Sequence, residues 1–340
     1  MLTVTAASGG IDVPACDDRA GPLANWSETQ MSIPIILDCD PGHDDVFAIW
    51  LAAANPNIDL LAVTSVAGNG ILEHTTLNAR IALTVAGAEG VPVAAGADRP
   101  IAETLRPAVW IHGENALGGP ELPEPTVPLE DIGAVDLMRD VIENHPEPVT
   151  IVATGPLTNV AILARDHPDD MAKVASVIWM GGSTTRGNIT PYAEFNAATD
   201  PEAIAIVLDS GVPFTMVGLN ITHQALVTSE VIDRIGAIPT ETAKFGGQLL
   251  NFFRAAYSSS RGMPDAPMHD PITVAMLADP TVATTQPTHL DVELKGEYTR
   301  GATCTDLTDF QNKPHNATVA LDLDVERFWQ MIEDALRALP

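Results

Sequence analysis

The stretch from Ile33 to Asp45 constrains the fold of this chain more than any other. It opens with a short apolar run, Ile33–Leu37, whose length and β-branching predict a buried strand. Pro41-Gly42 then gives a turn signal, and the apolar segment 46–54 predicts a buried helix that ends at Asn55-Pro56. Four carboxylates therefore lie at a strand–turn–helix corner: Asp38, Asp40, Asp44 and Asp45.

These four acids predict a metal site. Asp38 and Asp40 point to the same side of the strand because side chains alternate along it. Asp44 and Asp45 fall in the first helical turn, where the helix dipole favours negative charge. Crowded carboxylates repel one another at neutral pH, and a hard divalent cation with oxygen ligands removes that repulsion. A helix cap flanked by solvated acids is the simpler alternative, which suits one aspartate better than four.

Two other acidic motifs fit this corner poorly. An EF-hand loop that starts at Asp38 requires Gly at its sixth position and Glu at its twelfth, where this chain has His43 and Ile49. A haloacid-dehalogenase-type phosphatase also opens with a strand and Asp-x-Asp, which would make Asp38 the nucleophile and Asp40 the acid/base. The residues that follow Asp40 do not match the usual continuation of that family.

The rest of the chain alternates short apolar runs with helical patterns. The predicted strands are 59–66, 91–95, 148–153, 174–180 and 213–219, and the predicted helices are 71–86, 135–144, 157–165 and 201–208. This rhythm predicts a single large α/β domain with a mainly parallel, Rossmann-like sheet and helices on both faces. Ligands of such sheets bind at the carboxyl ends of the strands, so we expect the active site there.

The domain is expected to span residues 31–340. It includes a long helical segment, 240–260, and a strand–helix tail at 318–324 and 325–339. Residues 1–30 lack periodicity and are expected to form a loosely ordered N-terminal extension.

Charge and composition exclude several classes of partner. The net charge of −28, from 45 acidic against 17 basic residues, repels phosphate backbones and argues against nucleic-acid binding. No segment approaches the roughly 18 apolar residues of a membrane helix. The cysteines, Cys16, Cys39 and Cys304, are too scattered for a disulfide framework, so we expect a cytoplasmic protein.

The motif Asp-x-Asp-Pro-Gly-x-Asp-Asp after an apolar strand resembles the signature of the nucleoside hydrolases, the inosine-uridine-preferring N-ribohydrolases. Further matches follow in order from Ile33 to about Leu336, in segments 66–69, 111–113, 153–159, 179–182, 193–196 and 269–270. The resemblance implies calcium-dependent hydrolysis of the N-glycosidic bond of inosine- or uridine-type ribonucleosides to free base and ribose, in nucleoside salvage. It also implies a homodimer or homotetramer.

The resemblance also implies a role for each matching residue. Ca²⁺ would be bound by Asp40, Asp45, the Thr154 carbonyl and Asp270. Asp40 would be the general base, and His269 the acid for the leaving base, for which the near-neutral pKa of histidine is suitable. The substrate would be bound by Asp44, Asn69, His112, Met180, Asn188, Glu194, Phe195, Asn196 and Tyr257, with Asn188 and Glu194 at the 5′-hydroxyl and with His112 and Tyr257 at the base.

Two residues depart from the family pattern, and two alternatives stay open. Ala116 stands where the family usually has Gly, and Asn220 stands where Asp is common. Taken alone, several candidates also have ordinary interpretations: Asn69 as a turn residue, His112 as a surface histidine and Tyr257 as a core tyrosine. The alternatives to a nucleoside hydrolase are the haloacid-dehalogenase-like phosphatase and a non-catalytic protein that binds calcium or nucleosides.

Overall fold

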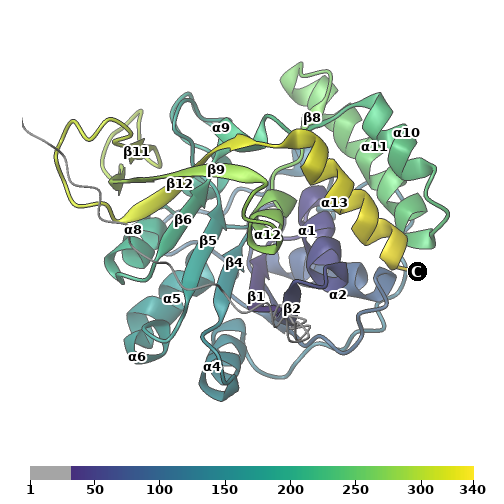
Figure 1. Cartoon of the computed structure of the whole chain (residues 1–340), viewed down its shortest axis with the longest axis horizontal. Coiled ribbons are helices and arrows are strands. Elements are labelled where there is room, and N and C mark those ends of the chain that lie inside the picture. Colours follow the sequence, from purple (N-terminus) through teal and green to yellow (C-terminus); the bar gives the residue numbers. More distant parts are fainter. Residues whose placement is uncertain (1–31) are drawn as a thin grey trace, which may run out of the picture. The chain divides into compact units, whose positions relative to one another are not determined.

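An eight-stranded sheet runs through residues 32–340, the part of the chain that the computed structural model describes (Figure 1). Its strand order is β3-β2-β1-β4-β5-β6-β12-β9. Neighbouring strands are parallel from β3 to β12, and only the edge strand β9 is antiparallel to its neighbour β12. The prediction of a mainly parallel α/β sheet is therefore confirmed. The extension predicted for residues 1–30 lies outside the described residues.

The elements have the following bounds. The sheet strands are β1 (Ile33–Cys39), β2 (Ile58–Ser65), β3 (Val93–Ala95), β4 (Thr150–Ala153), β5 (Ser176–Met180), β6 (Phe214–Val217), β9 (Ala283–Thr288) and β12 (Ala317–Leu323). Two small antiparallel pairs are β7 (Leu226–Val227) with β8 (Ala266–Pro267) and β10 (Leu290–Val292) with β11 (Thr303–Thr305). The helices are α1 (His43–Ala54), α2 (Leu72–Val85), α3 (Val109–His112), α4 (Ala134–Asn144), α5 (Thr158–Asp166), α6 (Pro168–Met171), α7 (Phe195–Thr199), α8 (Pro201–Asp209), α9 (Leu219–Thr222), α10 (Ser229–Gly236), α11 (Glu241–Arg261), α12 (Pro271–Ala278) and α13 (Val325–Ala338).

The alternation of side chains along β1 divides the core into two layers. Ile35, Leu37 and Cys39 face the layer that also contains residues of α1, α2, α11, α12 and α13. Ile36 faces the opposite layer, with residues of α4, α5 and α8. Because both faces of the central strands are covered, these strands read as continuous apolar runs in the sequence.

Within the eight-stranded sheet, the sequence prediction was wrong at the end of one strand and missed another strand. The strand predicted at 213–219 ends at Val217, and after Gly218 the chain turns into the short helix α9. The edge strand β9 was not predicted because it has no apolar run and is largely solvent-exposed. It also contains Pro287, which an edge strand tolerates because its free side needs no hydrogen-bond donor.

Parallel pairing brings the carboxyl ends of the central strands together. Asp38, near the end of β1, is in register with Thr64 of β2 and with Ala153 of β4, and Ala153 is in register with Trp179 of β5. The segments that follow these strands therefore meet at one edge of the sheet. In the described part of the chain, no helix combines the length and apolar character needed to cross a membrane.

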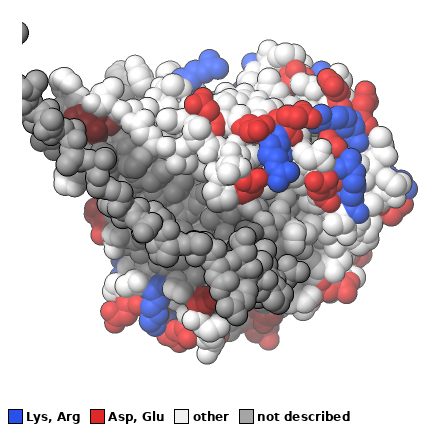
Figure 2. Space-filling model, viewed as in Figure 1, with Lys and Arg blue, Asp and Glu red and all other residues white. Residues whose placement is uncertain are grey.

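The outer surface carries many charged pairs. On the face shown in Figure 2, basic and acidic side chains lie next to one another over the region of α10 and α13. Arg234 pairs there with Glu326 and Glu333, and Arg337 pairs with Glu333 and Asp334. Exposed pairs of this kind contribute little to stability, so the buried layers hold the fold together.

We expect replacement of Trp50 in α1 to destabilise the protein strongly. Trp50 is 1% exposed, donates its Nε1–H to the Ala82 carbonyl at 2.9 Å and packs edge-on against Phe47. The substitution Trp50→Ala should lower the free energy of unfolding by about 3–5 kcal/mol, measured by urea denaturation. The matched control is Phe310→Ala, an aromatic residue that is 90% exposed, which should change it by less than about 0.5 kcal/mol. Equal effects of the two substitutions would contradict the assignment of Trp50 to the core.

Candidate functional site

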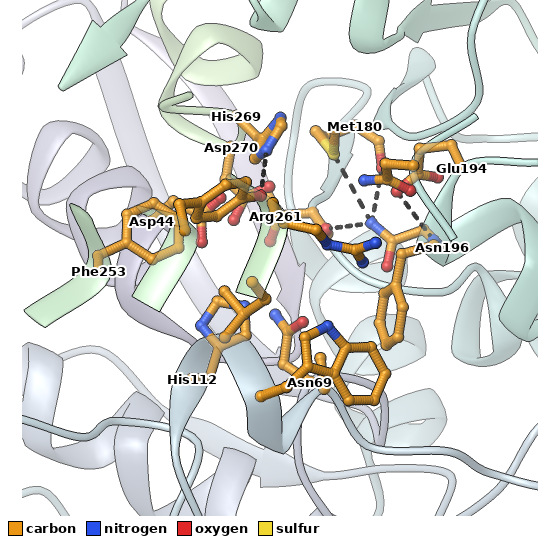
Figure 3. A pocket seen from close by; sticks show the side chains of 17 residues that line it. Asp44, Asn69, His112, Met180, Glu194, Asn196, Phe253, Arg261, His269 and Asp270 are labelled. Atoms are coloured by element: carbon orange, nitrogen blue, oxygen red, sulfur yellow. Dashed lines mark hydrogen bonds between the residues drawn. The ribbon is translucent and has the colours of Figure 1, made fainter. Parts of the chain in front are cut away.

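A cavity opens at the edge of the sheet where the central strands end (Figure 3). The residues that line it fall into two groups: carboxylates and amides such as Asp44, Asp270 and Asn196, which we name the polar side, and aromatic residues such as Phe253 and Tyr257, which with their neighbours we name the aromatic side. The residues that line it are Asp44, Asn69, Ala108, Trp110, Ile111, His112, Thr154, Met180, Asn188, Glu194, Phe195, Asn196, Phe253, Tyr257, Arg261, His269 and Asp270. The structure thus brings the predicted substrate residues together in one place.

Three carboxylates form the centre of the polar side. Asp44, Asp45 and Asp270 each offer an oxygen within 4.8 Å of the others. Asp45 accepts hydrogen bonds from the Thr154 hydroxyl at 2.7 Å, the Gly42 N–H at 2.9 Å and the Asn69 side-chain amide at 3.3 Å. Asp45 and Asp270 were predicted as metal ligands, whereas Asp44, the third member, was predicted to bind the substrate.

Asp40 lies beside this group. Its Oδ2 accepts a hydrogen bond from the Asn69 N–H at 2.6 Å, and its buried Oδ1 has no partner among the described residues. Two glycines make room for the carboxylate, because a Cβ at Gly68 or Gly155 would stand 2.0 Å or 2.7 Å from its oxygens. The glycines that follow β2 and β4 therefore fit close approach to Asp40.

Burial and mutual repulsion raise the pKa values of several acids at this site. Burial, followed by the charge of Asp45, raises the pKa of Asp40 well above its ordinary range and that of Asp44 to about 8. Burial and the charges of Asp44 and Asp45 also raise the pKa of Asp270. A divalent cation fits this site, because Oδ1 of Asp40 and Oδ1 of Asp44 are buried without partners among the described residues. The cluster could therefore hold a metal ion.

Asp38, the fourth acid of the corner, does not line the cavity. Its Oδ1 accepts hydrogen bonds from the Thr64 hydroxyl at 2.7 Å and from the Asn159 amide at 2.8 Å. Asp38 is fully buried, which raises its pKa to about 7. It therefore ties β1 to β2 and α5, and the interpretation of all four acids as one metal cluster is corrected to the cluster of Asp44, Asp45 and Asp270 with Asp40 beside it.

Glu194 and Asn196 order the segment between β5 and α7. Glu194 caps α7 by accepting hydrogen bonds from the N–H groups of Asn196 and Ala197, and it also accepts one from Gly182. Burial raises the pKa of Glu194 to about 7. The Asn196 amide donates to the carbonyls of Thr154 at 2.8 Å and Met180 at 3.0 Å (Figure 3). The nearby Asn188 has a buried Oδ1 without a partner among the described residues.

His269 is held at both ring nitrogens. Its Nδ1 lies 2.7 Å from the Thr222 hydroxyl, and its Nε2 lies 3.1 Å from the Tyr257 hydroxyl. Burial, followed by the charge of His223, lowers the pKa of His269 well below its ordinary value, which corrects the expectation of a near-neutral pKa. His269 is therefore neutral at pH 7, so one of its ring nitrogens donates in these two contacts and the other accepts.

His112 is held by His43, the histidine of the acidic corner. His43 Nε2 lies 2.8 Å from the Gly118 carbonyl, so this nitrogen carries a proton. Burial lowers the pKa of His43 to about 4, which leaves a lone pair on its Nδ1. His112 Nδ1 lies 3.1 Å from that atom and donates to it. The main-chain N–H of His43 also points at Nδ1 of His112, at 3.3 Å. We assign the tautomer of His112 from the two shorter contacts, at 2.8 Å and 3.1 Å. His112 Nε2 is then an acceptor.

The two departures from the family pattern have local explanations. Ala116 adopts a φ of +58°, a left-handed conformation in which Gly is unstrained and Ala is not. Asn220 does not line the cavity. It accepts a hydrogen bond from the Thr184 N–H at 3.3 Å and donates to the Ala320 carbonyl at 2.8 Å, so it ties the segment after β5 to β12.

Three residues of the aromatic side were not predicted from the sequence: Trp110, Phe253 and Arg261. Trp110 precedes His112 by two residues on the short helix α3. Phe253, Tyr257 and Arg261 recur every four residues along α11, so they lie on one face of that helix. This four-residue spacing could be seen in the sequence, within the predicted helix 240–260 and at the residue that follows it. Nothing in the sequence indicated which face of the helix meets the cavity.

Comparisons with known proteins agree over most of the chain. Residues 35–330 match the family described as inosine-uridine preferring nucleoside hydrolase. The pyrimidine-specific ribonucleoside hydrolase RihA of Shewanella sp. (strain MR-7) is 44% identical over 307 residues, which cover 90% of this chain and 96% of that protein. The protein of the same name from Shigella boydii serotype 4 (strain Sb227) is 45% identical over 311 residues, covering 90% and 99%.

Solved structures show the same relationship. The purine-preferring ribonucleoside hydrolase from Gardnerella vaginalis has a TM-score of 0.83 and 31% identity, over 89% of this chain and 98% of that one. A plant nucleoside hydrolase has a TM-score of 0.83 and 30% identity, over 90% and 99%.

We expect Gly42 to be essential for the packing of His112. A Cβ at this position would stand 2.4 Å from His112 Nδ1 and 3.1 Å from the Asn69 amide nitrogen. The substitution Gly42→Ala should lower the free energy of unfolding by about 1–3 kcal/mol and shift the NMR signals of the His112 imidazole. Gly90→Ala is the matched control, because a Cβ there meets nothing within 4 Å. Unchanged His112 signals in Gly42→Ala would contradict the close approach.

Proposed function

Because this chain belongs to the family of inosine-uridine preferring nucleoside hydrolases and is a ribonucleoside hydrolase, we propose that it uses a bound calcium ion to hydrolyse the N-glycosidic bond of ribonucleosides. One observation carries this proposal: a single cavity is lined both by buried carboxylates and amides and by aromatic residues and histidines. The first side is suited to ribose, whose hydroxyls both donate and accept hydrogen bonds. The second is suited to a flat nucleobase.

We propose Asp40, Asp45, Asp270 and the main-chain carbonyl of Thr154 as the ligands of the ion. All four offer oxygen atoms, which Ca²⁺ prefers. The unpartnered Oδ1 of Asp40 and the mutual repulsion of the acids support this assignment. When bound, the ion would supply positive charge that polarises nearby oxygen atoms and makes water a better nucleophile.

Asp40 is proposed as the general base. In the reaction, the oxygen of a water molecule forms a bond to C1′ of the ribose, the C1′–N bond breaks, and its electron pair moves to the base. One proton of the water must be removed, and the carboxylate of Asp40 is proposed to accept it. The neighbouring carboxylates stabilise the positive charge that develops on the ribose.

We propose that polar residues of the cavity hold the ribose. Asp44, Asn69 and Asn196 would bind its ring hydroxyls, and Asn188 and Glu194 its 5′-hydroxyl. The unpartnered oxygens of Asp44 and Asn188 support these roles, because each can accept a hydrogen bond from a hydroxyl without losing another. Met180 and Phe195 form the neighbouring wall.

Tyr257, His269 and His112 are proposed to act on the base. The contact between the Tyr257 hydroxyl and His269 Nε2 offers a route by which a proton reaches the leaving base. This route needs no charged histidine, which agrees with the lowered pKa of His269. His112 would accept a hydrogen bond from the base through its Nε2.

We propose uridine and cytidine as preferred substrates, ahead of inosine. Curated relatives that are 44–45% identical are named pyrimidine-specific, whereas the structural neighbour named purine-preferring is 31% identical. Membership of the family leaves no support for the phosphatase alternative or for a non-catalytic binding protein. The described cysteines, Cys39 and Cys304, are free, which supports the proposal of a cytoplasmic enzyme. Nucleoside salvage and a homo-oligomeric state are proposed by analogy with the family.

The first test is the release of reducing sugar from uridine, cytidine, inosine and adenosine. The wild type should release ribose, and Asp40→Asn should lower kcat by about 10²–10⁴-fold, because the general base is lost. The matched control is Asp98→Asn, an exposed acid whose side chain is 69% accessible and which should retain full activity. Undiminished turnover by Asp40→Asn would exclude Asp40 as the base.

The second test concerns calcium. A ligand that binds only the folded state at 100 times its dissociation constant stabilises that state by about 2.7 kcal/mol, so Ca²⁺ added after chelation should raise the Tm of the wild type. Asp270→Asn should reduce this increase, and Asp98→Asn should not. If Ca²⁺ shifts the Tm of the wild type and of Asp270→Asn equally, Asp270 is not a ligand.

A further inference from the structure

Arg261 is the only arginine or lysine that lines the cavity in the described part of the chain. It occupies the last turn of α11, on the same face as Tyr257 and Phe253. Phe253 is fully buried, Tyr257 is 9% exposed and Arg261 is exposed. This face of α11 therefore runs from the interior of the aromatic side to the solvent, and it ends in a cation.

No hydrogen bond or ion pair joins Arg261 to any other described residue. Its guanidinium lies over the indole of Trp110, with Cζ 6.0 Å from the ring centroid, an arrangement that favours a cation on an aromatic face. Figure 3 shows its side chain extending over the cavity. Most other arginines of the described chain are paired with carboxylates: Arg99, Arg139, Arg165, Arg234, Arg254, Arg300, Arg327 and Arg337. Arg261 thus keeps its donors free, in a chain with 45 acidic residues.

The chemistry of the proposed reaction separates charge across this cavity. Positive charge develops on the ribose, next to Asp44 and Asp270, and the electron pair of the broken C1′–N bond goes to the base. In a pyrimidine, that negative charge spreads onto the carbonyl oxygens of the ring. A guanidinium presents several planar N–H donors that suit such oxygens. A cation is unfavourable beside the ribose and favourable beside the departing base.

We infer that Arg261 is a further catalytic residue, which donates hydrogen bonds to the carbonyl oxygen of a pyrimidine base and stabilises the negative charge that the base acquires as it leaves. This inference rests on the proposed function. The contact with the Trp110 ring favours a position of the guanidinium at the cavity before substrate binds. Tyr257, one helical turn earlier, delivers the proton that finally neutralises the base.

The test compares two nucleosides whose bases differ in how easily they carry negative charge. Fluorine in 5-fluorouridine withdraws electrons, so its base leaves with less help than uracil does. Arg261→Gln should lower kcat for uridine on the order of 10- to 100-fold, the effect of one charge-assisted hydrogen bond, and should lower kcat for 5-fluorouridine less. The kcat for 5-fluorouridine divided by the kcat for uridine should therefore be larger in Arg261→Gln than in the wild type. In Arg261→Lys this ratio should return part of the way towards the wild-type value.

The matched control is Arg186→Gln. Arg186 is exposed in an adjoining hollow that Arg261 also lines, but it does not line the cavity itself, so both rates should stay within about twofold of wild type. Equal losses for both nucleosides in Arg261→Gln, or no loss, would overturn the inference alone. A wild-type protein that releases no ribose from any nucleoside would overturn the proposed function and this inference with it.

Discussion

Repulsion among buried carboxylates is the constraint on which the site depends. Asp40 follows β1, Asp44 and Asp45 lie in α1, and Asp270 lies at the start of α12. Burial makes the charges of Asp40, Asp44 and Asp270 costly. The surrounding backbone offsets part of this cost, since N–H groups of Gly42 and Asn69 donate to Asp45 and Asp40. These donors leave one oxygen each of Asp40 and Asp44 unsatisfied. A protein that only needed a stable core would place apolar residues here, so the arrangement is explained by a bound ligand.

The glycines of the acidic corner and of the neighbouring loops follow from the same constraint. Gly68 and Gly155 let the ends of β2 and β4 approach the Asp40 carboxylate, and Gly42 lets His112 reach His43. A side chain at any of these positions would push the strand ends apart. The sequence motif therefore encodes acids together with the space into which they fit.

The sequence predicted the polar side of the cavity better than the aromatic side. Acids and amides that follow buried strands can be placed at a sheet edge, because parallel pairing brings the strand ends together. Phe253 and Arg261 could not be placed in this way, since their position depends on how α11 packs across the molecule against α10 and α3. Asp38 was grouped with the other acids because the alternation of side chains along a strand shows which way a side chain points. It does not show which residue that side chain binds. Only the structure shows that Asn159 of α5 reaches it.

This division has a consequence for the evolution of specificity. The residues of the polar side hold one another through hydrogen bonds to strand ends, as Asn196 does with Thr154 and Met180, so a substitution there disturbs several contacts at once. The aromatic side is different, because Phe253, Tyr257 and Arg261 project from a single helix, and the outermost of them has no hydrogen bond or ion pair to lose among the described residues. Under the proposed function, substitution at the end of α11 would therefore change which base is accepted while the carboxylate cluster stays intact.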